Sequence, residues 1–189
     1  MTERPSYILF ITDQQRYDHL GCNGHPVLRT PNIDAIAAEG VSHDRFYVAS
    51  PVCMPNRASL MTCRMPSSHG TRSLGIPLNH DSVTFVELLA NAGYDTCLIG
   101  KSHLQNVSDF DIQIEPTKHR EGFTAPPEDL NVATRSDLDN DTYQYERQAY
   151  WDKPNPKVPL PFYGFKEYFA VMRHGFNTGG SHLEWVKKN

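Results

Sequence analysis

The chain has 189 residues, of which 39% are hydrophobic and 21% are charged, and its net charge is −4. This length and composition are typical of one globular domain with a real hydrophobic core. The charge argues against nucleic acid as a main partner, and no apolar stretch is long enough to span a membrane. We therefore expect neither nucleic acid nor a membrane as a partner.

The cysteines are scattered along the chain without C-x-x-C spacing: Cys22, Cys53, Cys63 and Cys97. This pattern favours reduced thiols over a zinc site or a disulfide framework. The apolar run near the N-terminus is followed by acidic and amide residues and by no small-residue cleavage site, so it does not read as a signal peptide. Both observations favour a cytoplasmic protein.

The first predicted strand is the run YILFIT, residues 7–12. It is continuously apolar, as expected for a central strand that is covered on both faces. Asp13 follows at its carboxyl end, where functional side chains of open α/β sheets often lie. A simple turn or cap residue is the plainer interpretation of Asp13 taken alone.

The next element is a helix that begins after Thr30 and stops at Gly40. Thr30 is a suitable N-cap, Pro31 suits the first helical position, and Gly40 suits the end. Residues 41–49 then predict a second strand. A short helix is predicted over residues 55–62.

The clearest helix starts at the capping box formed by Thr84 and Glu87, and Gly93 ends it. Apolar residues recur at helical spacing between these points. Residues 94–100 follow as another buried strand. Strands alternating with helices predict an α/β fold, with a largely parallel β-sheet flanked by helices.

Periodicity fades over residues 105–161, an irregular stretch of a length that often forms a binding surface or a lid. Residues 161–171 then predict a strand, and residues 181–189 predict the start of a helix. Because the sequence stops inside this helical pattern, we expect a truncated protein whose sheet is incomplete.

One short stretch around Cys53 admits two interpretations. In CMPNR, Cys53 precedes Pro55 at the start of the predicted helix, and Arg57 stands four residues further on. A lone cysteine is commonly a buried thiol. A nucleophile is the alternative, because the start of a helix favours an anion.

CMPNR matches the C-x-P-x-R core of the type I sulfatases, which belong to the alkaline phosphatase superfamily. The block GYDTCLIGKSHL, residues 93–104, resembles the second sulfatase signature, and FITDQQRYD, residues 10–18, resembles the first metal-binding strand. These motifs occur in the family's order. The resemblance extends from near residue 5 to the end of the chain.

This resemblance implies that residues 1–189 are the N-terminal part of a sulfatase catalytic domain with an alkaline-phosphatase-like fold, carrying an irregular insert near residues 105–161. Cys53 would be oxidised to formylglycine by a formylglycine-generating enzyme. The hydrated aldehyde would attack a small-molecule sulfate monoester, and its second hydroxyl would then release the sulfate. Arg57 would hold the formylglycine and the anion, while Lys101 and His103 would contact the sulfate and assist the leaving group.

The resemblance also implies a divalent metal. Asp13, Gln14 and the modified Cys53 would be its ligands in this chain, and hard oxygen ligands favour Ca²⁺, with Mg²⁺ or Mn²⁺ as alternatives. Gln14 stands where many sulfatases carry a second Asp, and Gln at this position is similar to phosphonate monoester hydrolases and choline sulfatases. The further ligands that the family uses have no match after Lys101.

Two departures from the family pattern are informative. Cys63 stands where the family usually has Gly after the short helix, which predicts a strained left-handed cap or a different helix end. Leu74 stands where relatives often carry an Asn that touches substrate.

Three alternatives to a sulfatase remain open at the level of the sequence. One is a phosphonate or phosphate diester hydrolase of the same superfamily. Another is an inactive truncated chain, which could associate with a second chain, including another copy of itself as a homo-oligomer. The third is a redox or binding protein that uses Cys53 as a thiol.

Overall fold

A computed structural model of the chain describes residues 4–107, 122, 139, 141–172 and 179–188. The chain forms two compact units, Met1–Tyr47 and Val48–Asn189. None of the helices among the described residues is both long enough and apolar enough to cross a membrane.

The first unit holds the short 3-10 helix η1 (Gly21–Asn23) and the helix α1 (Pro31–Glu39). The predicted bounds of α1 are confirmed, with Thr30 and Gly40 as the flanking residues. The Thr30 hydroxyl does not cap the helix backbone. It donates to Asp34 Oδ1 at 2.7 Å and accepts from the Gly21 N–H at 2.8 Å, so it fastens η1 to α1.

Two strand predictions in this region are wrong. Residues 7–12 and residues 41–49 are not in strands, and their apolar side chains are largely exposed. A strand, unlike a helix, needs hydrogen bonds to a neighbouring strand. Apolar continuity predicts which segments favour a sheet, but it supplies no partner.

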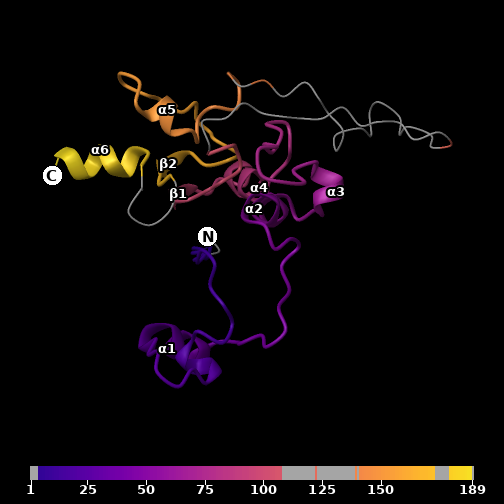
Figure 1. The fold of residues 1–189 in the computed structure, drawn as a ribbon, viewed down its shortest axis with the longest axis vertical. Coiled ribbons are helices and arrows are strands. Elements are labelled where there is room, and N and C mark those ends of the chain that lie inside the picture. Colours follow the sequence, from indigo (N-terminus) through magenta and orange to yellow (C-terminus); the bar gives the residue numbers. More distant parts are fainter. Residues whose placement is uncertain (1–3, 108–121, 123–138, 140, 173–178, 189) are drawn as a thin grey trace. The chain divides into compact units, whose positions relative to one another are not determined.

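The second unit combines helices with a two-stranded parallel sheet (Figure 1), which confirms the predicted α/β class. Strand β1 pairs with β2 in the register Cys97↔Glu167 to Gly100↔Ala170. Both strands are shorter than predicted. The elements in chain order are α2 (Cys53–Thr62), α3 (Pro66–His69), α4 (Phe85–Asn91), β1 (Cys97–Gly100), α5 (Gln148–Trp151), β2 (Glu167–Ala170) and α6 (Ser181–Lys188).

Helix α2 starts two residues earlier than predicted, at Cys53. Pro55 is tolerated inside its first turn because the first four N–H groups of a helix have no intrahelical acceptor. Helix α4 begins as predicted, since the Thr84 hydroxyl accepts the Glu87 N–H at 3.0 Å. The predicted irregular stretch, residues 105–161, lies largely outside the described residues, although α5 falls within it.

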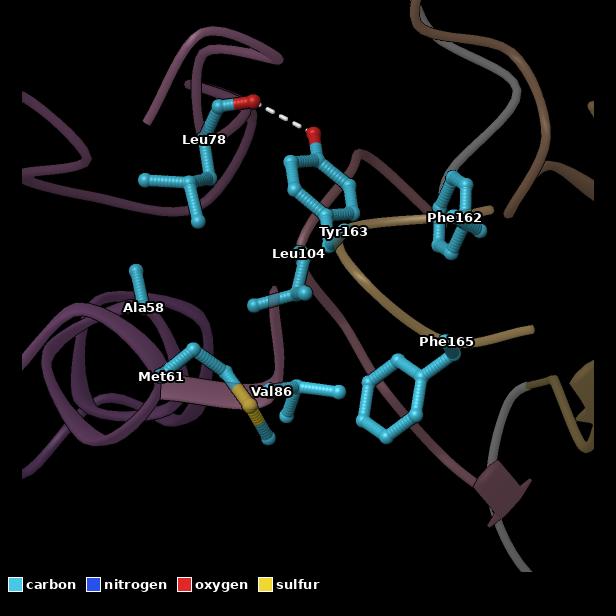
Figure 2. Packing of buried hydrophobic residues seen from close by; sticks show 8 residues of the cluster. All are labelled: Ala58, Met61, Leu78, Val86, Leu104, Phe162, Tyr163 and Phe165. Atoms are coloured by element: carbon cyan, nitrogen blue, oxygen red, sulfur yellow. Dashed lines mark hydrogen bonds between the residues drawn. The ribbon is translucent and has the colours of Figure 1, made fainter. Parts of the chain in front are cut away.

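The main core joins α2 and α4 to the loops that follow β1 and precede β2. Figure 2 shows its eight buried residues: Ala58, Met61, Leu78, Val86, Leu104, Phe162, Tyr163 and Phe165. The Tyr163 hydroxyl donates to the Leu78 carbonyl, so the one polar atom of this ring is satisfied inside the core. Burying apolar side chains of this size contributes about 1.5–3 kcal/mol each.

A tight two-residue turn lies at the centre of this core. Phe162 and Phe165 exchange N–H to carbonyl hydrogen bonds in both directions, each 2.9 Å long. Tyr163 and Gly164 between them both have positive φ, 47° and 91°, which is typical of a type I′ turn. The Thr84 hydroxyl donates to the Tyr163 carbonyl at 2.8 Å, so the turn also anchors the start of α4.

The end of α2 confirms the predicted strain at Cys63. This residue follows the helix in the left-handed conformation, with φ 55° and ψ 29°. A side chain in this conformation costs about 1–2 kcal/mol. A Gly at this position would avoid that cost.

Candidate active site

Cys53 and Arg57 are placed together by the geometry of α2. Residues four apart in a helix lie on the same face, so Cys53 and Arg57 share one face of α2. Cys53 is half-buried and its thiol is free. Arg57 is 6% exposed, which makes it a buried cation and not the solvated residue that an isolated arginine usually is.

Lys101 and His103 follow directly after β1, at the carboxyl end of the strand. Arg57 Nη1 donates to the Lys101 carbonyl oxygen at 2.5 Å, across 44 positions of sequence. The structure thus brings the C-x-P-x-R helix and the G-K-x-H loop together. His103 is buried and has φ 53°, a strained value for a non-glycine residue.

The loop after β1 is also hydrogen-bonded to the side chain of Glu146, which is 1% exposed. The Glu146 carboxylate accepts hydrogen bonds from the Ser102 hydroxyl, from the His103 N–H at 2.6 Å and from the Gln105 N–H. Sequence reasoning missed this residue, because an acidic side chain within a polar, aperiodic stretch carries no signal of burial.

Burial raises the pKa of the Glu146 carboxyl, and the hydrogen bonds from Ser102 and from the backbone of Gln105 and His103 oppose that rise. Each of these three donors satisfies a carboxylate lone pair. Such bonds favour the charged form of a buried acid.

The two remaining predicted residues, Asp13 and Gln14, belong to the first unit. They form an exposed bend, and Gln14 has φ 54°. One carboxylate and one amide oxygen are hard ligands of the kind that Ca²⁺ and Mg²⁺ take, but two ligands do not make a metal site. Within the described part of the chain, no three His, Cys, Asp or Glu side chains gather where they could hold a metal ion.

Ser59 and His69 form a second pair, of the kind that can act as a nucleophile and its general base, but here the pair has a structural role. Ser59 Oγ lies 2.9 Å from His69 Nε2, and both residues are buried. The Thr71 N–H donates to His69 Nδ1 at 3.2 Å, so Nε2 carries the proton and donates to Ser59. A histidine that donates to the serine cannot act as its general base, and the pair instead links α2 to α3.

This pair predicts a pH dependence of stability. Burial lowers the pKa of His69 from its ordinary value of 6.5, so below that value the unfolded state binds more protons than the folded state. The stabilisation is complete above about pH 6.5 and is lost as the pH falls through the lower folded pKa. We expect the free energy of unfolding to fall more between pH 7.5 and pH 5 in the wild type than in His69→Gln, measured by denaturant titration.

The matched control for this prediction is His182→Gln, which replaces an exposed histidine. It is expected to keep the wild-type difference between the two pH values. Equal pH dependence in the wild type and in His69→Gln would contradict the prediction.

Comparison with known proteins identifies the family. A family model described as Sulfatase matches residues 5–157. The chain is 41% identical to human arylsulfatase A over 108 residues, which are 53% of this chain and 21% of that protein. It is 30% identical to an ulvan-active sulfatase of Formosa agariphila over 169 residues, or 89% of this chain and 30% of the relative.

A solved phosphonate monoester hydrolase of Agrobacterium radiobacter has the same fold, with a TM-score of 0.54 at 24% identity over 94% of this chain and 27% of that one. The fold and the motifs therefore define an α/β protein of the sulfatase class. The chain belongs to the sulfatase family. It spans about a fifth to a third of the length of these curated relatives.

Proposed function

We propose that Cys53, converted to formylglycine, is the nucleophile of an enzyme that hydrolyses sulfate monoesters and of which this chain forms a part. The observation that carries the proposal is the hydrogen bond from Arg57 Nη1 to the Lys101 carbonyl. This bond links the helix that begins at Cys53 to the loop that carries Lys101 and His103. A protein that used Cys53 only as a buried thiol would not need this link.

The placement of the side chains supports the role proposed for each of them. Residue 53 is free, partly accessible and located in the first turn of α2, where backbone N–H groups without intrahelical partners favour an anion. The hydrated aldehyde supplies one hydroxyl for attack and a second whose deprotonation releases the sulfate. Arg57 orients residue 53 and offsets its charge, Lys101 attracts the sulfate, and His103 protonates the leaving oxygen.

A divalent cation is part of the proposal. Sulfatases are generally dependent on a metal and on formylglycine. Asp13 and Gln14 would supply two of the oxygen ligands for Ca²⁺, Mg²⁺ or Mn²⁺, and further ligands would come from outside the described residues. A formylglycine-generating enzyme is the partner that modification of Cys53 requires.

A second candidate is hydrolysis of phosphonate or phosphate diesters. Gln14 favours it, because a second Asp at that position would add a full negative charge beside Asp13. With Gln14 in place of Asp, the ligands of the proposed metal site carry less negative charge, and this changes how strongly the site attracts a phosphonate or a sulfate ester. The two candidates share Cys53, Arg57, Lys101 and His103 and differ in substrate.

The test compares kcat/KM for an aryl sulfate and for the matching aryl phosphonate monoester, using the enzyme that contains this chain, isolated from its own cells. A hydrazide probe is applied in parallel to detect an aldehyde at residue 53. We expect an aldehyde and a preference for sulfate. Preference for phosphonate would establish the second candidate, and an unmodified thiol with no turnover of either ester would refute both.

A further inference from the structure

Glu146 is a buried carboxylate that the proposed chemistry does not use. Four hydrogen-bond donors to it lie among the described residues: the backbone N–H groups of His103 and Gln105 and the hydroxyls of Ser102 and Tyr168. The Tyr168 hydroxyl lies 2.7 Å from Ser102 Oγ and 3.4 Å from Glu146 Oε1. All four partners are on the loop after β1 or on β2, its neighbouring strand.

Burying a carboxylate is unfavourable, because its charge loses the hydration of water unless hydrogen-bond donors of the protein replace it. Here three of the donors, Ser102, His103 and Gln105, belong to one loop, so the carboxylate fixes several neighbouring parts of that loop at once. Since side-chain carboxylates have two oxygens, Glu146 can accept from His103 on Oε1 and from Gln105 on Oε2 at the same time.

The residue that most needs such support is His103. Its left-handed backbone, with φ 53°, is strained for a non-glycine residue, and a strained residue persists only where its surroundings hold it. The Glu146 carboxylate accepts the N–H of this same residue at 2.6 Å. The bond therefore stabilises the backbone conformation that sets the direction of the imidazole.

The loop is held at its other end by Arg57, through the Lys101 carbonyl at 2.5 Å. The Leu104 carbonyl also accepts the Leu78 N–H at 2.8 Å, which ties the loop to the core. Glu146 thus acts on the centre of a segment whose flanks are already fixed. Its specific contribution is the orientation of residues 102–105.

We propose that Glu146 is a positioning residue that orients the His103 imidazole toward the leaving oxygen of the ester. The proposal rests on the function proposed above for His103. Glu146 does not touch the substrate, and its effect on turnover passes through His103.

The experiment replaces Glu146 with Gln, which keeps the shape but exchanges one acceptor oxygen for an NH₂ group that cannot accept a hydrogen bond. Para-nitrophenyl sulfate has a good leaving group that needs little protonation, whereas phenyl sulfate has a poor one. We expect kcat on phenyl sulfate to fall about 10–100-fold and kcat on para-nitrophenyl sulfate to fall much less. A general loss of folded enzyme would lower both rates equally.

The coupling to His103 is tested by adding His103→Ala. Once the imidazole is gone, Glu146→Gln should have little further effect on phenyl sulfate turnover, because residues that act through one another are non-additive. The matched control is Glu167→Gln, which removes an exposed carboxylate on β2 and should leave both rates unchanged. Equal losses on the two esters, or full additivity with His103→Ala, would overturn the proposal.

A second measurement does not depend on turnover. Amide hydrogen exchange at residues 102–105 should be faster in Glu146→Gln than in the wild type, and unchanged exchange would overturn the proposal. If Glu146→Gln does not fold, Tyr168→Phe removes one hydroxyl from the same cluster and is expected to give the same substrate pattern at smaller amplitude. An inactive wild type with faster exchange in the variant would refute the proposed function alone.

Discussion

In the enzyme that contains this chain, Cys53→Ala is expected to lower the turnover of sulfate esters by a factor on the order of 10⁴–10⁶. This is the range seen when a covalent nucleophile is removed. The loss is chemical, because alanine suits a first helical turn and the thiol of residue 53 is half-exposed and free. Turnover of an aryl sulfate and the thermal unfolding midpoint are measured on the same variant. A loss of turnover with an unchanged midpoint shows that the chemistry is lost and the fold is kept.

Cys53→Ser distinguishes the hydrated aldehyde from an ordinary nucleophile. A serine has one hydroxyl, so it can attack the ester but has no second hydroxyl whose deprotonation expels the sulfate. We expect at most one equivalent of released phenol per enzyme, without further turnover. Steady turnover by the serine variant would show that formylglycine is not required.

The matched control is Cys63→Ala, because Cys63 is an exposed cysteine that follows the last residue of α2, at the opposite end of the helix from Cys53. Its aryl sulfatase activity is expected to stay at the wild-type level. If Cys53→Ala retained more than about a tenth of the wild-type rate, the assignment of the nucleophile would be wrong.

Gly164→Ala is expected to have the largest effect on stability, about 3–5 kcal/mol in the free energy of unfolding. A Cβ at this position would lie 2.4 Å from the Glu87 nitrogen and 2.6 Å from the Glu87 Cα, both backbone atoms. Gly164 also has φ 91°, where a side chain is strained. Neither the turn nor the start of α4 can move freely, since Thr84 and Tyr163 are hydrogen-bonded to each other.

Gly75→Ala is the matched control, because Gly75 has a similar φ of 87° but nothing lies within 4 Å of the added Cβ. It should cost only the conformational strain, about 1–2 kcal/mol. Denaturant unfolding of the three proteins gives both values. Equal losses in the two variants would mean that the turn does not pack against α4 as described.

The sequence predicted the parts of the fold whose hydrogen bonds are local. The bounds of α1 and the cap of α4 follow from a few neighbouring residues, such as Pro31 and Thr84, because a helix satisfies its backbone within its own segment. A buried strand was predicted at residues 94–100, and the structure has the shorter strand Cys97–Gly100, in which Ile99 is exposed. The strand expected at residues 7–12 was not found, because strand formation depends on a partner that apolar continuity does not specify.

The candidate site divides in the same way. Motif spacing was enough to single out Cys53, Arg57, Lys101 and His103, because each pair lies within a few residues in the chain. The contact between these two pairs is a hydrogen bond between residues 44 positions apart. Only the packing of α2 against the loop after β1 decides it.

By itself, then, the sequence determined the family, the local helices and the residue types of the chemistry, since each is written in short stretches of chain. The tertiary structure decided which residues are buried and which of them support the residues of the candidate site. Glu146 is the clearest case, as a carboxylate in an aperiodic segment that becomes 1% exposed and supports His103 from 43 residues away. Burial is a property of the whole packed chain, and no local pattern of residues encodes it.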